Sequence, residues 1–233
     1  KQSLFRSDKF RRAMSHLVNR QAVIDIVYGG LGTPMYSSVY PVLTQWINPK
    51  VPKYEYDPKQ AAKLLAELGF TKKDREGYLV DSKGRRIEFN LATNAGNTQR
   101  EQIAKLIVDE AKKVGVKVNF QAIDFNTLVG QLLSSGPDRP FDAIIIGLTG
   151  GGLDWPFGSN VVPCKGNLHM WNKSGQCLDP RETLMEKLYY QGRLSATDKS
   201  LHRKDFVRAA QADGLDYAVR LDSTADVPRV LQQ

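Results

Sequence analysis

The sequence predicts an α/β fold in which a mixed sheet is flanked by helices. The extended segment 86–92, an amphipathic helical segment and the alternating segment 116–122 follow one another in the order strand, helix, strand. A short apolar run at 141–146 has the length of one further buried strand. With 233 residues and 41% hydrophobic side chains, the chain is long enough to bury a core in one large domain or two small ones.

The first element is a helical pattern from Ser7 to Tyr28, in which apolar residues recur at three- and four-residue steps. Asn19-Arg20 interrupts the apolar stripe, so the pattern fits one helix or two consecutive ones. Gly29-Gly30 ends it, as a left-handed helix cap would. The following segment, 31–53, is rich in proline, glycine and aromatic residues and predicts a long irregular stretch of the kind that is often functional.

A second helix and a hairpin come next. Asp57-Pro58 predicts a helix with an N-cap and a proline in its first turn, and Gly69 ends that helix. Tyr78–Val80 and Arg86–Ala92 flank the turn sequence at 81–84, which predicts that the two segments pair as a hairpin.

The remaining elements alternate between helix and strand. Thr98 and Glu101 predict a capping box at the start of a helix that ends at Gly115. Asp124 predicts the cap of a further helix, before the apolar strand 141–146.

In α/β sheets, ligands bind beyond the carboxyl ends of the strands, which directs attention to the residues after Ile146. Within fourteen residues of that strand end, the chain offers glycines that let a ligand approach the backbone, a carboxylate, an aromatic face and polar groups. These candidates are Gly147, Leu148, Thr149, Gly150, Gly151, Asp154, Trp155, Ser159 and Asn160. The segment is neither a P-loop nor a dinucleotide-binding fingerprint. The residues alone favour a surface loop with Trp155 packed inward over a binding loop.

Charge and catalytic motifs exclude several function classes. The 33 basic and 25 acidic residues give a net charge of +8, but the basic residues are scattered in pairs and no nucleic-acid motif is present. No nucleophile elbow or zinc-protease motif occurs. We therefore expect a protein that is not an enzyme, holds no cofactor or metal and binds no nucleic acid. A hydrolase using His169 and a basic nucleic-acid-binding module are the alternatives from other classes.

Cys164 and Cys177 flank a stretch that is rich in Gly, Asn and Ser. A disulfide would stabilise an exported protein by about 3 kcal/mol. Two unpaired buried thiols are equally compatible with the residues alone. His169 lies between the cysteines, so a metal site is conceivable, although the spacing matches no known pattern.

The order of these motifs resembles bacterial family 5 extracellular solute-binding proteins, the oligopeptide- and dipeptide-binding components of ABC importers. The run from Phe10 to Arg20, FRRAMSHLVNR, is similar to the family's RxAlsyaiDR helix, and the run from Tyr56 to Phe70 is similar to its yDpekAkkLLaeaGf helix. The hairpin, the helix ending in Val-Gly-Val at 114–116 and the strand starting Phe-Asp-Ala at 141–143 follow in the family's order. The resemblance covers about Leu4 to Tyr190.

The resemblance implies a periplasmic-binding-protein-like type II lobe, one lobe of a two-lobed clamp. We expect 1–190 to form the second lobe, often called domain III, and 191–233 to be a C-terminal segment that departs from the family pattern. The first lobe is missing, so we expect the chain to be part of a longer, exported protein of the periplasm or cell surface. The implied partners are a peptide ligand and an ABC permease in the membrane. A non-peptide solute, such as an oligosaccharide or nickel chelate, is the alternative within the family.

Peptide-binding members have an aromatic residue and an aspartate shortly after the Phe-Asp-Ala strand, where this chain has Leu148 and Gly151. Asp154 is the nearest carboxylate that could bind a peptide's amino terminus in its place. A subgroup of the family does share the stretches Gly147–Gly151, Ser159-Asn160 and 168–172, and the last stretch includes His169 and Trp171.

The resemblance implies two further features. Tyr36, in the irregular stretch 31–53, becomes a candidate aromatic residue of the binding cleft. Export favours a Cys164–Cys177 disulfide over two free thiols.

Overall fold

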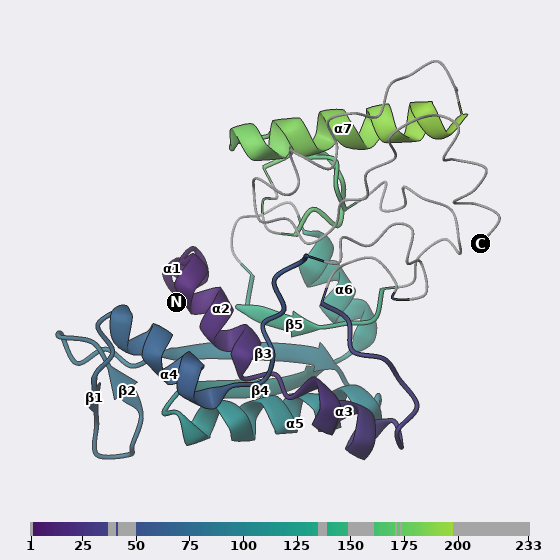
Figure 1. Ribbon diagram of the computed structural model, residues 1–233. Coiled ribbons are helices and arrows are strands. Elements are labelled where there is room, and N and C mark those ends of the chain that lie inside the picture. Colours follow the sequence, from purple (N-terminus) through teal and green to yellow (C-terminus); the bar gives the residue numbers. More distant parts are fainter. Residues whose placement is uncertain are drawn as a thin grey trace. The chain divides into compact units, whose positions relative to one another are not determined.

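Figure 1 shows a computed structural model of the protein, which describes residues 2–36, 41, 50–134, 139–148, 161–170, 172 and 174–197. The chain divides into two compact units. Unit 1 comprises Lys1–Pro34, Tyr54–Leu132 and Asp138–Gly147, and unit 2 comprises Met35–Lys53, Leu133–Pro137 and Leu148–Gln233. All described strands belong to unit 1.

A three-stranded parallel sheet organises unit 1 (Figure 1). Its order is β4 (Lys117–Ile123), β3 (Glu88–Asn94) and β5 (Ala143–Ile145), so β3 is the central strand. Helix α5 (Thr98–Lys113) connects β3 to its parallel neighbour β4, which confirms the predicted strand-helix-strand unit. Antiparallel pairing among the described residues is confined to β1 (Lys72–Lys73), β2 (Leu79–Val80) and one isolated bridge.

One hydrophobic core joins the sheet to four helices of unit 1. Helices α1 (Gln2–Phe5), α2 (Asp8–His16) and α4 (Pro58–Glu67) pack with α5 against β3 and β4. The buried members of this core are Phe10, Ala13, Leu17, Ala61, Leu65, Phe70, Leu79, Ile87, Phe89, Leu91, Ala104, Ala111, Val116 and Val118. Burial of this apolar surface is what holds the helices on the sheet.

The predicted interruption at Asn19 separates two helices. Asn19 is the N-cap of α3 (Arg20–Val27), and its Oδ1 accepts the N–H of Ala22 at 3.0 Å. Gly29 and Gly30 follow with φ of +59° and +83°, the left-handed geometry that the sequence predicts for them. The Asp57 cap of α4 is confirmed in the same way, because its Oδ1 accepts the N–H of Gln60.

The predicted hairpin is only partly right. The turn forms, and Asp81 Oδ1 accepts the N–H groups of Lys83 and Arg85 at 2.9 Å. The flanking segments, however, meet only through a bridge between Val80 and Arg86, and β2 pairs with β1 instead. The rest of the second segment forms β3, which pairs with β4 over its whole length and with β5 at Leu91–Thr93.

The predicted capping box of α5 is displaced by one residue. The N-cap is Asn97, whose Oδ1 accepts the N–H of Arg100 at 2.9 Å, and Glu101 Oε1 accepts the N–H of Gly96 at 3.1 Å. Asparagine and threonine both suit an N-cap, so two such residues in a row do not show which one begins the helix.

Two more helices complete the described chain. Helix α6 (Phe125–Leu133) follows Asp124, whose Oδ1 accepts the N–H of Thr127 as predicted. Helix α7 (Pro180–Thr197) belongs to unit 2, and the predicted boundary between 190 and 191 falls inside it. Within the described residues, no helix has both the length and the apolar character that a membrane span requires.

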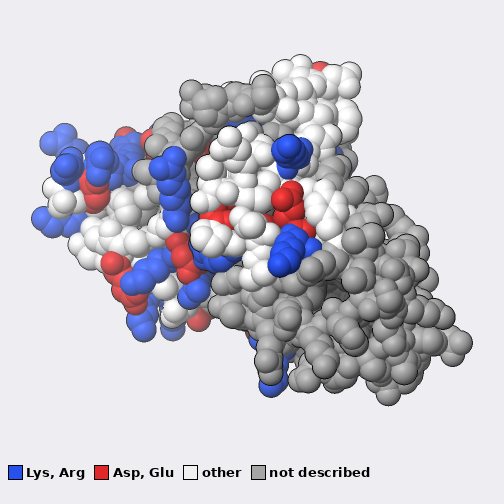
Figure 2. All heavy atoms as spheres, turned by 90° about the horizontal axis from the view of Figure 1, so that it is seen from above, with Lys and Arg blue, Asp and Glu red and all other residues white. Residues whose placement is uncertain are grey.

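Acidic side chains lie among the basic ones on the described surface, as Figure 2 shows for one face. In three places where two basic residues follow each other, at 11–12, 85–86 and 112–113, at least one of them is paired with a carboxylate. Arg12 pairs with Asp8, Arg86 with Asp74 and Glu76, and Lys113 with Glu110. On the described surface, positive charge is therefore interspersed with negative charge.

Candidate functional site

The carboxyl edge of the parallel sheet carries polar groups that are held in place by hydrogen bonds. Because the three strands run parallel, their carboxyl ends at Asn94, Ile123 and Ile145 lie along one edge. Thr93 is fully buried there, and its hydroxyl donates to the carbonyl of Ile145 at 2.8 Å. This bond ties the end of β3 to the end of β5.

Arg100 brings a permanent positive charge to this edge. It lies in the first turn of α5, and its Nη1 donates to Asn94 Oδ1 at 2.6 Å. Asn94 is 9% exposed and ends β3, so the guanidinium is anchored on the sheet itself. Among the described residues, none of the ion pairs involves Arg100. A guanidinium fixed in this way has the geometry to bind a carboxylate.

Gly147 lies directly against Arg100. A Cβ atom placed on Gly147 would stand 2.5 Å from Arg100 Nη2, which is far closer than any real contact of that kind. The position after β5 therefore requires a glycine for Arg100 to keep its place. In this way, the first residue of the predicted glycine loop comes together with a cation that the sequence analysis did not single out.

Four of the predicted ligand residues fall within the described part of the chain. Gly147 is at the sheet edge, and Leu148, which follows it, is 51% exposed. In unit 2, Tyr36 is half-buried, with Lys53 Nζ 5.6 Å from its ring centroid, and His169 is buried. The other predicted ligand residues lie outside the described residues, and their roles stay predictions: Thr149, Gly150, Gly151, Asp154, Trp155, Ser159, Asn160 and Trp171.

A signal for the missed pair, Asn94 and Arg100, was present in the sequence. The rule that ligands bind beyond strand ends applies to β3 as it does to β5. The predicted strand stopped at Ala92, however, whereas β3 continues to Asn94. Ending it two residues early moved the sheet edge away from Asn94 and left Arg100 as an ordinary helix residue.

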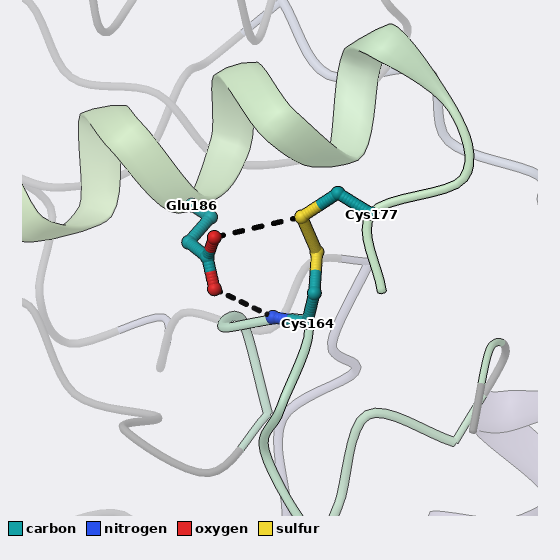
Figure 3. Close-up of side chains that lie close together, drawn as sticks. All are labelled: Cys164, Cys177 and Glu186. Carbon is teal, nitrogen blue, oxygen red and sulfur yellow. Dashed lines mark hydrogen bonds between the residues drawn. A yellow bond between two sulfur atoms is a disulfide. The ribbon is translucent and has the colours of Figure 1, made fainter. Parts of the chain in front are cut away.

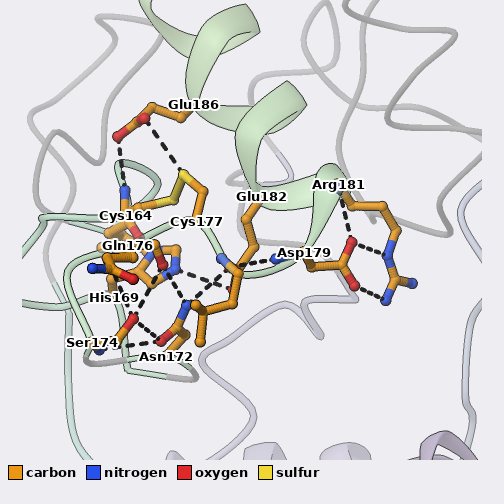
Figure 4. The surroundings of a disulfide bond; sticks show 12 residues. Cys164, His169, Asn172, Ser174, Gln176, Cys177, Asp179, Arg181, Glu182 and Glu186 are labelled. Carbon is orange, nitrogen blue, oxygen red and sulfur yellow. Dashed lines mark hydrogen bonds and ion pairs between the residues drawn. A yellow bond between two sulfur atoms is a disulfide. The ribbon is translucent and has the colours of Figure 1, made fainter.

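A second polar cluster surrounds the cysteines in unit 2 (Figure 4). Cys164 and Cys177 form a disulfide with a Cα–Cα distance of 5.4 Å, which confirms the pairing that export favours. His169, within the loop that they close, is 1% exposed. Its Nδ1 lies 2.9 Å from the carbonyl oxygen of Val161, and its Nε2 lies 3.5 Å from Glu182 Oε1.

Glu182 fixes the start of α7 beside this loop. Its Oε2 accepts Asn172 Nδ2 and the N–H of Leu178, both at 2.9 Å. Burial raises the pKa of Glu182, but these bonds, together with one from His169, outweigh burial and hold the pKa below its usual value. Nearby, the side chain and N–H of Arg181 lower the pKa of Asp179 to about 2. Both carboxylates are thus ionised at neutral pH, next to the positive N-terminal end of the helix.

Removing the disulfide is expected to lower the free energy of unfolding by about 3 kcal/mol, because the bond closes a loop with a sequence separation of 13. Urea unfolding of Cys164→Ser/Cys177→Ser and of the parent protein, followed by tryptophan fluorescence, measures this difference. Two alkylatable thiols in the denatured, unreduced parent protein would contradict the disulfide.

Comparisons with known proteins identify the family. Residues 1–166 match the model for bacterial extracellular solute-binding proteins, family 5 middle region. A probable ABC transporter-binding protein of Deinococcus radiodurans is 54% identical over 202 residues, which is 83% of this chain and 34% of that protein. Heme-binding protein A of Haemophilus influenzae is 31% identical over 115 residues, covering 49% of this chain and 19% of that protein.

Among solved structures, the oligopeptide-binding protein AppA of Bacillus subtilis, in complex with a nonapeptide, matches with a TM-score of 0.64 and 28% identity. The match covers 80% of this chain and 36% of AppA. The chain thus spans about a third of the length of the relatives that it matches. Proteins of this family bind solutes rather than transform them, and their solved structures share the type II periplasmic-binding-protein fold. The chain belongs to the bacterial extracellular solute-binding proteins of family 5.

Proposed function

We propose that this chain is the second lobe of the solute-binding component of an ABC importer, and that the complete protein binds peptides between two lobes. Residues 1–190 would form this lobe. Closure of the lobes around the ligand stabilises the closed state, which a membrane permease then recognises. The protein would work outside the cytoplasmic membrane, in the periplasm or at the cell surface.

The observation that carries this proposal is the position of Arg100. Its guanidinium is held by Asn94 at the carboxyl edge of the sheet and touches the glycine that begins the predicted binding loop. A peptide offers carbonyl oxygens along its length and a carboxylate at its end, and both accept hydrogen bonds from a guanidinium. The predicted roles of residues 149–151 as backbone donors and of Asp154 as the partner of the peptide's ammonium group stay separate proposals.

The relatives support peptide over other solutes but include exceptions. AppA, which matches 80% of this chain, is described in complex with a nonapeptide. Heme-binding protein A and a nickel-binding protein of Staphylococcus aureus, 26% identical over 114 residues, belong to the same set of relatives. Heme also carries carboxylates, so a heme-like or chelated cargo is the second candidate, and Arg100 would have the same role in both.

Native mass spectrometry of the complete two-lobed protein, purified without denaturation, distinguishes the cargoes. A ladder of copurified masses that fragment as peptides would support the proposal. A single tetrapyrrole, sugar or metal chelate would keep the solute-binding function and remove peptides from it. Turnover of an added peptide by the purified protein would contradict a pure binding function.

The 233-residue chain alone is expected to bind peptide weakly, because it offers one side of a two-sided cleft. If the complete protein binds with a Kd of about 1 μM, losing half of the binding free energy moves the Kd to about 1 mM. Isothermal titration calorimetry of the isolated chain and of the complete protein, with the same peptide, measures the difference. Submicromolar binding by the isolated chain would show that the first lobe contributes little.

A further inference from the structure

Three side chains that can bind a metal, Glu186, His169 and Glu182, lie beside the disulfide of unit 2. Glu186, on α7, points toward both cysteines in Figure 3. Its Oε1 accepts the N–H of Cys164 at 2.9 Å, and its Oε2 lies 3.5 Å from Cys177 Sγ. A disulfide sulfur carries no hydrogen, so this second contact is a close approach, whereas a thiol at the same place could donate a hydrogen bond.

Two overlapping groups of ligand atoms meet at Cys164. The ligand atoms of Cys164, Cys177 and Glu186 lie within 4.8 Å of one another, and so do those of Cys164, His169 and Glu182. We propose that, once its disulfide is reduced, this cluster binds one Zn²⁺ through the thiolates of Cys164 and Cys177, the carboxylate of Glu186 and the imidazole of His169. The site is independent of the cargo.

The chemistry of the set fits zinc. Thiolate, imidazole and carboxylate are its usual ligands, in a tetrahedral arrangement that places ligand atoms about 3.3–3.8 Å apart. The three ligand atoms of each group lie within 4.8 Å of one another. Breaking the sulfur–sulfur bond allows the two sulfurs to separate and accept a metal between them.

His169 is already oriented as metal-binding histidines are. Its Nδ1 faces the carbonyl oxygen of Val161 at 2.9 Å, and a carbonyl oxygen only accepts, so Nδ1 carries the hydrogen. The other ring nitrogen, Nε2, shares a hydrogen bond with Glu182 in the disulfide form and would give up this bond and its hydrogen to bind the metal. A backbone carbonyl that fixes the ring in this tautomer is a common second partner of a zinc-bound histidine. Glu182, 3.5 Å from Nε2, is the carboxylate that the metal would displace or share.

Conversion of the disulfide into the zinc site needs a reductant and Zn²⁺, and no other reactant. A dithiol breaks the Cys164–Cys177 bond, transfers two electrons to it and becomes a disulfide itself. The two protein thiols and His169 Nε2 then each release one proton as Zn²⁺ binds. Bound zinc would hold both sulfurs as thiolates and slow the re-formation of the disulfide, so the cluster would switch between a covalent and a metal-bound link.

Titration with Co²⁺, followed by Zn²⁺, tests the proposal on the full 233-residue chain. After reduction with a dithiol and removal of the reductant under argon, one Co²⁺ per chain is expected, with thiolate-to-cobalt charge-transfer bands and the visible bands of tetrahedral cobalt. Zn²⁺ should abolish these bands stoichiometrically. Absence of bands in the reduced chain, or equal bands in the oxidised chain, would overturn the site.

Two variants separate ligation from folding. Cys177→Ser, reduced alongside the parent chain, should bind Co²⁺ at least about 100-fold more weakly. Even the loss of a residue that only hydrogen-bonds to a metal ligand lowers metal affinity by about 10- to 100-fold, and Cys177 would be a ligand itself. Glu186→Gln keeps an oxygen that can accept the Cys164 N–H and should also weaken binding. Glu67→Gln, which alters a carboxylate that pairs with Lys9 on α2, is the matched control and should leave binding unchanged. Equal affinity in Glu186→Gln and Glu67→Gln would remove Glu186 from the site.

Discussion

Replacing Arg100 with alanine in the complete protein is expected to weaken peptide binding by about 10- to 150-fold. A hydrogen bond that involves a charged group contributes about 1.5–3 kcal/mol, and each 1.4 kcal/mol changes an equilibrium constant tenfold. The guanidinium is fixed by Asn94, so little ordering opposes its contact with a ligand. Isothermal titration calorimetry with a peptide identified in the native complex measures the loss.

A C-terminally amidated form of the same peptide shows what Arg100 binds. If the partner is the terminal carboxylate, amidation weakens binding to the parent protein and has little effect on Arg100→Ala. If the partner is a peptide carbonyl, amidation weakens both proteins equally. This comparison is a double-mutant cycle. Any effect of Arg100→Ala on folding is present with both peptides and therefore cancels.

Two further substitutions control for charge and position. Arg85→Ala removes one positive charge from an exposed side chain that pairs with Asp81, and it should leave affinity unchanged. Gly147→Ala keeps the charge of Arg100 but forces its Nη2 to move, because the new Cβ would stand 2.5 Å away. Since the atom displaced is the tip of a flexible side chain, affinity should fall while the melting temperature changes little. Full affinity in both Arg100→Ala and Gly147→Ala would remove the sheet edge from the binding site.

The elements with strong local signals could be predicted from the sequence. Asn19 and Asp57 begin helices because their side chains accept N–H groups of the first turn, an interaction within three residues along the chain. The parallel unit of β3, α5 and β4 was equally predictable, because its periodicity changes from strand to helix and back.

The errors concern contacts between residues that are distant in sequence. The parallel pairing of β3 with β5 joins segments that are far apart in the chain, and no local pattern predicts it. The same limit applied to the site. Arg100 is a candidate because Asn94, at the end of β3, and Gly147, after β5, lie beside it in the fold.

The side chains that surround the cysteines could not be predicted from the sequence for the same reason. The chain order shows His169 between Cys164 and Cys177, and the resemblance to exported proteins favoured the bond between them. Glu186 lies on α7, which follows the disulfide loop in the chain. Only the packing of α7 beside that loop brings its carboxylate to the N–H of Cys164.

Replacing Phe10 with alanine is expected to lower the free energy of unfolding of unit 1 by about 3–5 kcal/mol. Phe10 is fully buried, and its ring lies edge-on to Phe5 and Phe89, with centroid distances of 5.0 and 6.4 Å. Truncation removes the aromatic contacts and leaves a cavity between α2 and the sheet. A domain of this size is typically stable by about 5–15 kcal/mol, so the loss is a large share of the total.

The loss of stability has to be measured with a probe that lies in unit 1, where Phe10 is. All three tryptophans, Trp46, Trp155 and Trp171, belong to unit 2, whereas Phe10 and β3 belong to unit 1. Hydrogen exchange at the amides of β3 therefore reports the effect more directly than tryptophan fluorescence does. The matched control is Phe125→Ala, at the start of α6, because Phe125 is 49% exposed and should cost far less. Equal losses of β3 protection in the two variants would show that the ring of Phe10 is not what holds α2 on the sheet.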